Sequence, residues 1–440
     1  MQPSRVEIFL DANAGLPLSP KLLEAAQKVF RDAAFCVANP SSLHEPGRTA
    51  RKLINQARLA VAQSLSGLSS QSHQVRAFPE KRVFFTSSGT EANQWVLRSC
   101  FDATPDPAST WQWLLSAAEH ESLSSVITYW QARGVRVAVI PVNSDGRLEL
   151  SALEEQLQEG SSRGVRTLVS ALWVHNETGV IQDVARISEC VRSARGLLHL
   201  DGAQAWGKIP LDSARDCADF VTFSGCKIGA FAGTGVLWCR APHEHLTALF
   251  GGKQESGYRG GTENLLGIFS LGKAAELVEE KLNQVGKTQD SRDALEKALM
   301  GSLPGLSVAG SQTARAANTS LFLIAGIQSQ KLVQILDRKG ISCSVGSACS
   351  SGQAEPSESL LAMGYSREQA MGALRLSLLE PLTEVQQSWI LEQIRTGVQM
   401  LRGSDFLNSN RIAAMSNKPH PYFPITQTET PADDASSNDR

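Results

Sequence analysis

The stretch FVTFSGCKIGAFAG, residues 220–233, begins as an apolar run of strand length and places a single lysine, Lys227, just beyond its end. Phenylalanine, valine and threonine favour a buried strand, and the Ser-Gly pair that follows them favours a turn. A lysine at a strand end is most often a solvated charge at the edge of a sheet. A lysine that is removed from water serves instead as a base or as a nucleophilic amine. The residues that follow the neighbouring strands decide between these two roles.

Other apolar, β-branched segments of strand length occur on both sides of this stretch. They cover residues 82–87, 111–117, 135–142, 166–174, 197–201 and 235–239. Amphipathic segments such as LSSVITYWQARG and RISECVRSARG separate them, and the second ends in a glycine that we expect to cap its helix. Together with the strand at 219–224, this alternation predicts an α/β fold with a mostly parallel, seven-stranded sheet.

The pattern changes after about residue 266. A long helix over 266–286 is followed by a short strand, NTSLFLI, a helix over 330–340, a Gly/Ser-rich loop and a final pair of helices that ends near Leu401. We therefore expect a large domain at 18–266 and a smaller α+β domain made of 1–17 and 267–402. Residues 403–440 are polar and contain prolines, which is typical of a disordered tail.

Composition excludes several classes of protein. The 440-residue chain is 42% hydrophobic and 20% charged with a net charge of -2, so it has neither a basic surface for nucleic acid nor an acidic tract. No apolar run is long enough to cross a membrane, and the N-terminus has neither a signal nor a transit pattern, which predicts a cytoplasmic protein. The eight cysteines show no CxxC or regular ligand spacing, so we expect no disulfide framework and no metal site.

Polar side chains follow several of the predicted strands. In an open α/β sheet the ligand binds beyond the carboxyl ends of the strands. The residues at these ends are SSGTEAN after 82–86, His175-Asn176-Glu177 after 166–174, Asp201 and Gln204 after 197–200, and Ser224 and Lys227 after 219–223. The first of them, at residues 87–90, offers small side chains and free N–H groups at a helix start, which suits a phosphate but is also ordinary helix capping.

A carboxylate, an amide, a lysine and a phosphate cradle at neighbouring strand ends are the parts that bind pyridoxal 5'-phosphate. Lys227 would hold the cofactor covalently, and Asp201 would keep the pyridine nitrogen protonated so that the ring withdraws electrons. Asp201 alone is equally well explained as a helix N-cap. The set of residues, and not any one of them, therefore predicts the cofactor.

Ten segments between about Phe9 and Leu401 together resemble the cysteine desulfurases of the NifS/IscS type. They are FLDANAGLPLSP, NPSSLHEPGRTAR, FFTSSGTEAN, AEHESL, HNETGVIQD, HLDGAQAWGK, TFSGCKIG, YRGGTEN, SVGSACSSGQAEPS and ALRLSL. These proteins are fold-type I pyridoxal phosphate enzymes of the class V aminotransferase group. The resemblance implies that fold, with a large cofactor-binding domain and a smaller domain, in a homodimer.

The resemblance also implies a role for each matching residue. The phosphate would be bound by Thr90, the Gly89 backbone, Ser224 and, from the other subunit, Thr262. The ring would be contacted by His120 over its face, Asn176 near its hydroxyl and Gln204 at its phenolic oxygen. The substrate would lie beside Asn176, and its carboxylate would be clamped by Arg375, whose planar fork suits a bidentate contact.

The segment SVGSACSSGQ, residues 344–353, contains little that could pack, so we expect a mobile loop. By the resemblance, its Cys349 is the nucleophile that takes sulfur from L-cysteine, leaving L-alanine and a persulfide. His120 would move protons for the thiol groups. The loop would then hand the sulfur to an acceptor such as an iron–sulfur scaffold protein.

Two departures from the family pattern leave alternatives open. Cys226 stands where the family usually has histidine, and a thiol is a weaker donor to the cofactor. The segment DANAGLP lacks the threonines that are common in the family, so Gly15 and Leu16 alter a loop expected near the substrate entrance. A selenocysteine lyase fits most of the same motifs. A sulfur-transfer adaptor with little cofactor is the alternative outside the enzymes.

Overall fold

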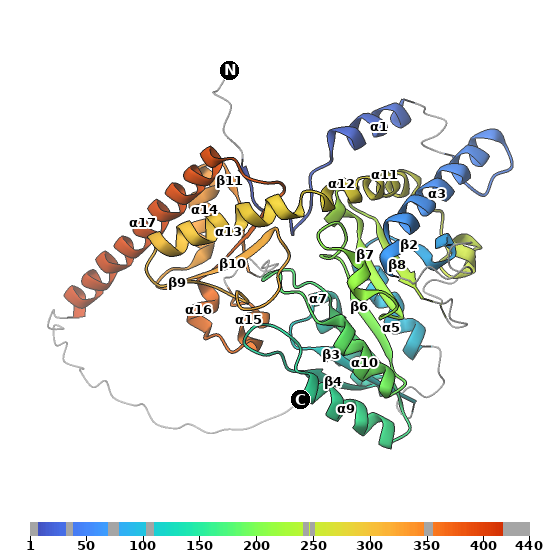
Figure 1. Ribbon diagram of the computed structural model, residues 1–440, viewed down its shortest axis with the longest axis horizontal. Helices are drawn as coiled ribbons and strands as arrows, with labels where there is room; N and C mark the ends of the chain where they lie inside the picture. Colours follow the sequence, from blue (N-terminus) through green and yellow to red (C-terminus); the bar gives the residue numbers. More distant parts are fainter. Residues whose placement is uncertain are drawn as a thin grey trace, which may run out of the picture.

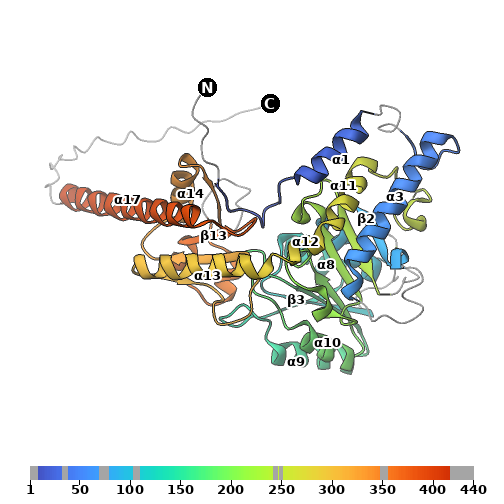
Figure 2. The same ribbon diagram turned by 45° about the horizontal axis from the view of Figure 1, so that its top comes forward.

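The computed structural model describes residues 8–31, 38–68, 79–102, 110–240, 246, 251–346 and 355–416. Cys349, the predicted nucleophile, lies outside these residues. Figures 1 and 2 show two groups of elements in the described part of the chain, with the short helix α12 (Val278–Leu282) between them in both views.

The first group is built on a seven-stranded sheet with the strand order β2-β8-β7-β6-β5-β3-β4. Its strands are β2 (Val83–Thr86), β3 (Trp111–Ser116), β4 (Arg136–Ile140), β5 (Arg166–Leu172), β6 (Leu197–Asp201), β7 (Phe220–Ser224) and β8 (Gly235–Cys239). Only β8 runs antiparallel to its neighbours in this sheet. The predicted fold class and its mostly parallel sheet are confirmed, and β5, β6 and β7 end side by side at one edge.

The central strands of this sheet are buried on both sides because helices cover both of its faces. They include α5 (Gly89–Phe101), α9 (Leu150–Ser162) and α10 (Val184–Ser193). Two further helices, α3 (Glu45–Ser64) and α11 (Leu265–Glu276), pack closely on each other. A Cβ at Gly272 of α11 would lie 2.6 Å from Ala57 of α3, so this contact requires a glycine.

The prediction that a glycine, Gly196, caps the C-terminal end of α10 is wrong. Arg195, with φ 56°, adopts the left-handed conformation at the end of this helix, and Gly196 does not. Gly196 has another role, because a Cβ there would lie 3.1 Å from Val191 and 3.2 Å from the carbonyl oxygen of Thr167. The glycine lets the chain pass close to the sheet.

The second group contains a four-stranded antiparallel sheet in the order β12-β13-β10-β9. Its strands are β9 (Leu306–Val308), β10 (Thr319–Ile324), β12 (Ser344–Val345) and β13 (Ala373–Ser377), and its main helices are α13 (Val285–Ser302), α14 (Ser329–Arg338) and α17 (Glu384–Ser416). The N-terminal strand β1 (Ile8–Phe9) pairs in parallel with β11 (Ile341–Ser342). Ile8 and Leu10 are therefore buried in the core of this second group. Dividing the chain after residues 17 and 266 remains a proposal.

Three expectations for the C-terminal half are wrong in detail. The predicted helix over 266–286 is three helices, α11, α12 and α13, and one of the breaks falls at Asn283, a weak helix former. The segment after the Gly/Ser-rich loop forms two short helices, α15 (Glu358–Ala362) and α16 (Arg367–Met371), and the strand β13 before α17 begins. Alanine, leucine and arginine in β13 favour a helix locally, and pairing with β10 overrides that preference.

The third correction concerns the tail. Helix α17 continues to Ser416, so residues 403–416 are helical in backbone and not structureless. The stretch contains no proline before Pro419 and includes good helix formers such as leucine, alanine and methionine. Residues 417–440 lie outside the described part of the chain. Within that part, no helix combines the length and the apolar character that a membrane span needs.

Candidate active site

Lys227 lies in a short turn that follows β7. The turn, η4 (Gly225–Ile228), is closed by Gly229, whose φ of 84° favours glycine. It is held against the start of β8, because the Gly225 N–H donates to the Thr234 carbonyl at 2.9 Å. The half-buried Lys227 amine donates to the carbonyl of Ala14 at 2.6 Å, and burial lowers the pKa of Lys227 below its ordinary value. A larger fraction of the amine is therefore uncharged and nucleophilic than on a solvated lysine.

Asp201 is the last residue of β6 and is only 4% exposed. Its Oδ2 accepts a hydrogen bond from Asn93 Nδ2 at 2.7 Å, and its Oδ1 accepts one from the Ala203 N–H at 3.0 Å. Asn93 comes from α5, in the motif SSGTEAN, and its own oxygen accepts from the Thr222 hydroxyl. The carboxylate is thus fixed from both sides by residues of the sheet and of α5.

A buried histidine supports this network from beneath. His199 lies in β6, within hydrogen-bond distance of Ser170 Oγ at 3.2 Å and Thr222 Oγ1 at 3.1 Å. Burial lowers the pKa of His199 to about 4, so the ring is neutral at physiological pH. Because the His199 ring is neutral, it does not form an ion pair with Asp201. The carboxylate therefore remains available to pair with a protonated nitrogen of a ligand.

His120 caps the short helix α7 (Glu121–Ser124) through its ring. The Ser122 N–H donates to His120 Nδ1 at 3.1 Å, so the neutral ring carries its proton on Nε2. Ser122 Oγ lies 2.8 Å from the same Nδ1 and accepts from Asn93 Nδ2 at 2.8 Å. A chain of hydrogen bonds therefore joins His120 to Asp201, and Nε2 is the atom that can exchange a proton.

The N-terminal segment at residues 11–16 contacts several residues of this site, and its expected place near the substrate entrance stays a prediction. Besides the Lys227 contact, its Asn13 carbonyl accepts from Gln204 Nε2 at 2.9 Å, and its Leu16 N–H donates to the Cys226 carbonyl at 2.9 Å. The segment thus contacts the lysine turn directly. Gly15 and Leu16 lie against the residue that precedes Lys227, because a Cβ at Gly15 would be 3.8 Å from the Cys226 carbonyl oxygen.

Arg375 projects from the centre of the small sheet and is 6% exposed. Its Nη2 donates to Asp11 Oδ1 at 2.7 Å and its Nη1 to the Asn176 carbonyl at 3.2 Å. The Nε atom is buried and has no hydrogen-bond partner among the described residues. The guanidinium is held in place by these contacts and retains a donor for a ligand. Asn176 contacts Arg375 through its backbone carbonyl, which also accepts a hydrogen bond from Asn13 Nδ2 at 3.0 Å.

Gln204 is held at both ends of its amide. Its Nε2 donates to Asn13, and its Oε1 accepts from the amine of Lys208, which also donates to Asn13 Oδ1 at 2.7 Å. Because the amide nitrogen carries two N–H donors, one remains for a ligand oxygen. Burial lowers the pKa of Lys208 well below its ordinary value. Lys208 and Asn13 were not singled out from the sequence, although both lie within quoted motifs.

The predicted phosphate residues form a second cluster at the start of α5. Ser88 caps this helix, accepting from the Glu91 N–H at 3.0 Å, and Thr90 is exposed in its first turn. A Cβ at Gly89 would lie 3.2 Å from Ser224 Cβ, so these two predicted residues adjoin. Cys226 Sγ lies 3.3 Å from Ser224 Oγ. The thiol therefore lies beside Ser224, and its predicted contact with the cofactor stays a prediction.

Thr262 lies near this cradle within its own subunit. It lines a pocket of about 140 Å³ together with Ser87. Arg259, in the same segment, pairs with Glu91 of α5 through an Nε–Oε1 distance of 2.9 Å. The predicted contact of Thr262 with the other subunit is not tested by a single chain, and it stays a prediction.

Two buried carboxyl groups, Glu119 and Glu177, adjoin the site; Glu177 was named among the strand-end residues without a role, and Glu119 was not singled out from the sequence. Glu119 accepts from the Leu172 N–H at 2.8 Å, and burial raises its pKa well above the ordinary value. Burial likewise raises the pKa of Glu177, while it lowers the pKa of His175 to about 4. All three groups are biased toward their neutral forms. For Glu119, the position beside His120 in the motif AEHESL was the signal in the sequence. The described residues contain no group of three potential ligands that could hold a metal ion.

The donor set fits pyridoxal phosphate. A lysine with a lowered pKa interacts with a fixed carboxylate, and both the lysine and an amide with a spare N–H contact the N-terminal segment. Gly89 adjoins Ser224 at the start of a 13-residue helix. A helix start with free N–H groups is where a phosphate is expected to bind. Arg375 adds a buried cationic donor from the other sheet. Of the predicted site residues, only Cys349 lies outside the described part of the chain.

Comparisons with known proteins agree with this geometry. Residues 8–386 match the family model described as "Aminotransferase class-V". The chain is 33% identical over 402 residues to "Cysteine desulfurase 2" of Trichormus variabilis, covering 91% of this chain and 96% of the relative. It is 31% identical over 396 residues to "Cysteine desulfurase IscS" of Methanosarcina thermophila, covering 90% and 93%. A solved NifS-like protein from Rickettsia africae superposes with a TM-score of 0.76 at 29% identity, covering 89% of this chain and 99% of that one.

Proposed function

Because the chain belongs to the aminotransferase class-V family, we propose that it is a cysteine desulfurase that uses pyridoxal 5'-phosphate to remove sulfur from L-cysteine. The observation that carries the proposal is the convergence of Lys227, Asp201 and Arg375 on one site, together with the N-terminal segment at residues 11–16. We further propose a cytoplasmic homodimer in which Thr262 completes the phosphate site of the partner subunit.

One set of residues would bind the cofactor. Lys227 would hold the cofactor, and its amine would move the α-proton of the substrate. Asp201 would favour a protonated pyridine nitrogen, and Gln204 would offer its spare N–H to an oxygen of the cofactor. Gly89, Thr90 and Ser224 would bind the phosphate. The bound cofactor supplies an electron sink for the α-carbon of the substrate.

Other residues bind the substrate and transfer its sulfur. Arg375 holds the carboxylate of L-cysteine, and Asn176 lies beside it. The Cys349 thiolate attacks the substrate sulfur, so that a sulfur–sulfur bond forms while the carbon–sulfur bond breaks. His120 Nε2 moves the protons of the thiols. The net reaction converts L-cysteine and the Cys349 thiol into L-alanine and a Cys349 persulfide, which then passes its sulfur to an acceptor such as an iron–sulfur scaffold protein.

The experiment that tests this function measures alanine released from L-cysteine and from L-selenocysteine under the same conditions. A desulfurase is expected to turn over L-cysteine and to require Cys349 for it. Turnover of L-selenocysteine alone would assign the chain to the selenocysteine lyases. Purified protein without a cofactor absorbance near about 420 nm after loading with pyridoxal phosphate would favour a sulfur-transfer adaptor.

Replacing Arg375 by lysine is expected to raise KM for L-cysteine by about tenfold or more, with a smaller effect on kcat. A planar fork becomes a point charge, and a hydrogen bond between charged groups contributes about 1.5–3 kcal/mol. Steady-state kinetics of alanine release measures the effect. Arg292→Lys is a matched control, because Arg292 is another buried arginine of the small domain and donates to the Ala316 carbonyl at 2.8 Å. An unchanged KM in Arg375→Lys would remove this residue from the carboxylate site.

Replacing Cys226 by histidine is expected to slow the loss of pyridoxal phosphate during dialysis by about tenfold. The imidazole is a stronger donor than the thiol that now lies 3.3 Å from Ser224 Oγ, at the phosphate end of the site. Cofactor absorbance against dialysis time measures the retention. The half-buried Cys217 is remote from the site, so Cys217→His serves as the control. Equal loss from wild type and Cys226→His would show that this position does not affect cofactor binding.

A further inference from the structure

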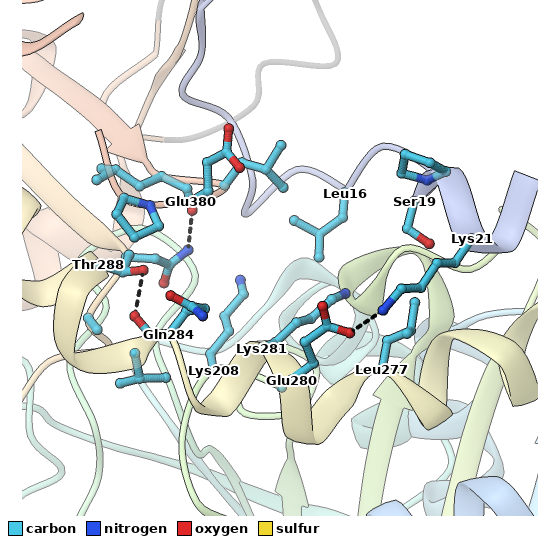
Figure 3. A pocket seen from close by; sticks show the side chains of 18 residues that line it. Leu16, Ser19, Lys21, Lys208, Leu277, Glu280, Lys281, Gln284, Thr288 and Glu380 are labelled. Atoms are coloured by element: carbon cyan, nitrogen blue, oxygen red, sulfur yellow. Dashed lines mark hydrogen bonds and ion pairs between the residues drawn. The ribbon is translucent and has the colours of Figure 1, made fainter. Parts of the chain in front are cut away.

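A pocket of about 420 Å³ lies where the two groups of elements meet. Its lining includes Leu16 of the N-terminal segment, Lys208 of the turn after β6, Leu277 and Lys281 around α12, Thr288 of α13 and Glu380 after β13. Figure 3 shows the Lys208 side chain pointing up between Gln284 and Lys281, toward the segment that carries Leu16. None of the predicted cofactor or substrate residues lines this pocket, so it is separate from the candidate active site.

Two lysines place their amines at this pocket without a carboxylate partner. Lys208 donates only to the neutral oxygens of Asn13 and Gln204, and Lys281 donates to the carbonyl of Ile228 at 2.6 Å. Neither forms a salt bridge within the described part of the chain. Burial lowers the pKa of Lys281 to about 8 and the pKa of Lys208 well below its ordinary value. A buried amine of this kind gains from an anion that takes the place of the missing counter-charge.

The carboxylates that line the pocket do not provide a negative charge for Lys208 or Lys281. Glu280 pairs with Lys21 at 2.7 Å, and both side chains are mostly exposed, as the dashed contact in Figure 3 shows at one side of the pocket. Glu380 is also exposed. The charges nearest to Lys208 include Lys227 and Arg375, which are positive as well. The inner end of the pocket therefore presents two lysine amines that have no carboxylate partner among the described residues, and an anion bound there would favour their protonated forms.

The remaining lining is largely apolar and limits what the anion can be. Leu16, Leu277, Val285 and Leu379 contribute aliphatic side chains, with prolines at residues 20 and 381. An inorganic anion would leave this surface in contact with water. An organic anion with a short aliphatic part would bury it, and the volume lies within the range of pockets that bind small molecules.

We propose that this pocket binds a small aliphatic monocarboxylate, whose head group accepts hydrogen bonds from Lys208 and Lys281 and whose tail lies against Leu16 and Leu277. The ligand contacts both groups of elements and reaches Gln204 of the candidate active site through Lys208. The site does not depend on the proposed function.

The test is calorimetric titration of hexanoate into the cofactor-loaded, full-length protein. Wild type is expected to bind hexanoate, with hexanamide binding at least about tenfold more weakly, because the amide lacks the charge that a charge-assisted hydrogen bond needs. Lys281→Met should weaken hexanoate binding by at least about tenfold. Leu277→Trp, which fills the pocket, should abolish it. Lys287→Met, at an exposed lysine of α13 outside the pocket, should bind as wild type does.

Three results would overturn the proposal. Hexanoate and hexanamide could bind equally, which would exclude recognition of the charge. Lys281→Met could bind hexanoate as tightly as wild type does. Hexanoate binding could also be weakened in Arg375→Lys but not in Lys281→Met, which would place the carboxylate in the substrate site instead. Because the measurement is binding and not turnover, a failure of the proposed desulfurase activity leaves these outcomes unaffected.

Discussion

The Lys227→Ala variant is expected to lose the cofactor absorbance near about 420 nm and to release alanine from L-cysteine at least about 10³-fold more slowly than wild type. Lys227 follows β7 beside the end of β6, and its amine, with a pKa lowered by burial, contacts the segment that also binds Arg375. Alanine cannot donate a nucleophilic amine or move the α-proton. Absorbance of the loaded protein and single-turnover alanine release measure the two effects.

The control is Lys273→Ala, at a lysine of α11 that pairs with Glu276 on the surface. It should keep both the absorbance and the turnover. A second amine, that of Lys208, lies near the site and is the alternative candidate for the covalent bond to the cofactor. An absorbance that survives in Lys227→Ala and disappears only when Lys208→Ala is added would assign the covalent bond to Lys208, contrary to the account.

The Cys349→Ala variant is expected to keep the cofactor absorbance and to lose alanine release from L-cysteine by at least about 10³-fold. In the proposed function the cofactor would be held by Lys227, Asp201 and the Gly89–Ser224 cradle, and none of these residues needs the Cys349 thiol. Without a nucleophile, the substrate sulfur cannot leave onto the protein. Spectra recorded with added L-cysteine and an alanine assay measure the two properties separately.

The control for Cys349→Ala is Cys343→Ala. Cys343 is the neighbouring thiol in the sequence, but it is buried, and burial raises its pKa to about 12, which makes it a poor nucleophile. Its loss should leave alanine release near the wild-type rate. If Cys349→Ala retains turnover of L-cysteine and Cys343→Ala loses it, the assignment of the nucleophile is wrong.

The large sheet was predictable because its strands carry their own signal. Segments such as residues 166–174 and 219–224 are apolar and β-branched, and central parallel strands are buried on both faces, so local composition and final burial agree. The same reasoning failed for β13, whose residues favour a helix, because its strand is specified by pairing with β10. It also failed for residues 403–416, where polar composition suggested disorder and the backbone is helical.

The part of the candidate site that lies at the ends of the strands was predictable from the sequence. Asp201 ends β6 and Lys227 follows the end of β7, so their shared edge follows from the parallel topology. The supporting contacts were not predictable, because they join residues far apart in sequence. Asn93 binds Asp201 across 108 positions, and Asn13 binds Lys208 across 195. Assigning Arg375 to the substrate required the family resemblance, since nothing local distinguishes it from a structural arginine.

The most direct test of the central claim is peptide mass mapping of the cofactor-loaded wild-type protein after one turnover of L-cysteine, with alanine measured in the same sample. We expect a mass increase of about 32 Da, one sulfur atom, on the peptide that contains Cys349, together with one alanine for each persulfide. Alanine without added sulfur on Cys349, or added sulfur on Cys226 or Cys343 instead, would contradict the central claim.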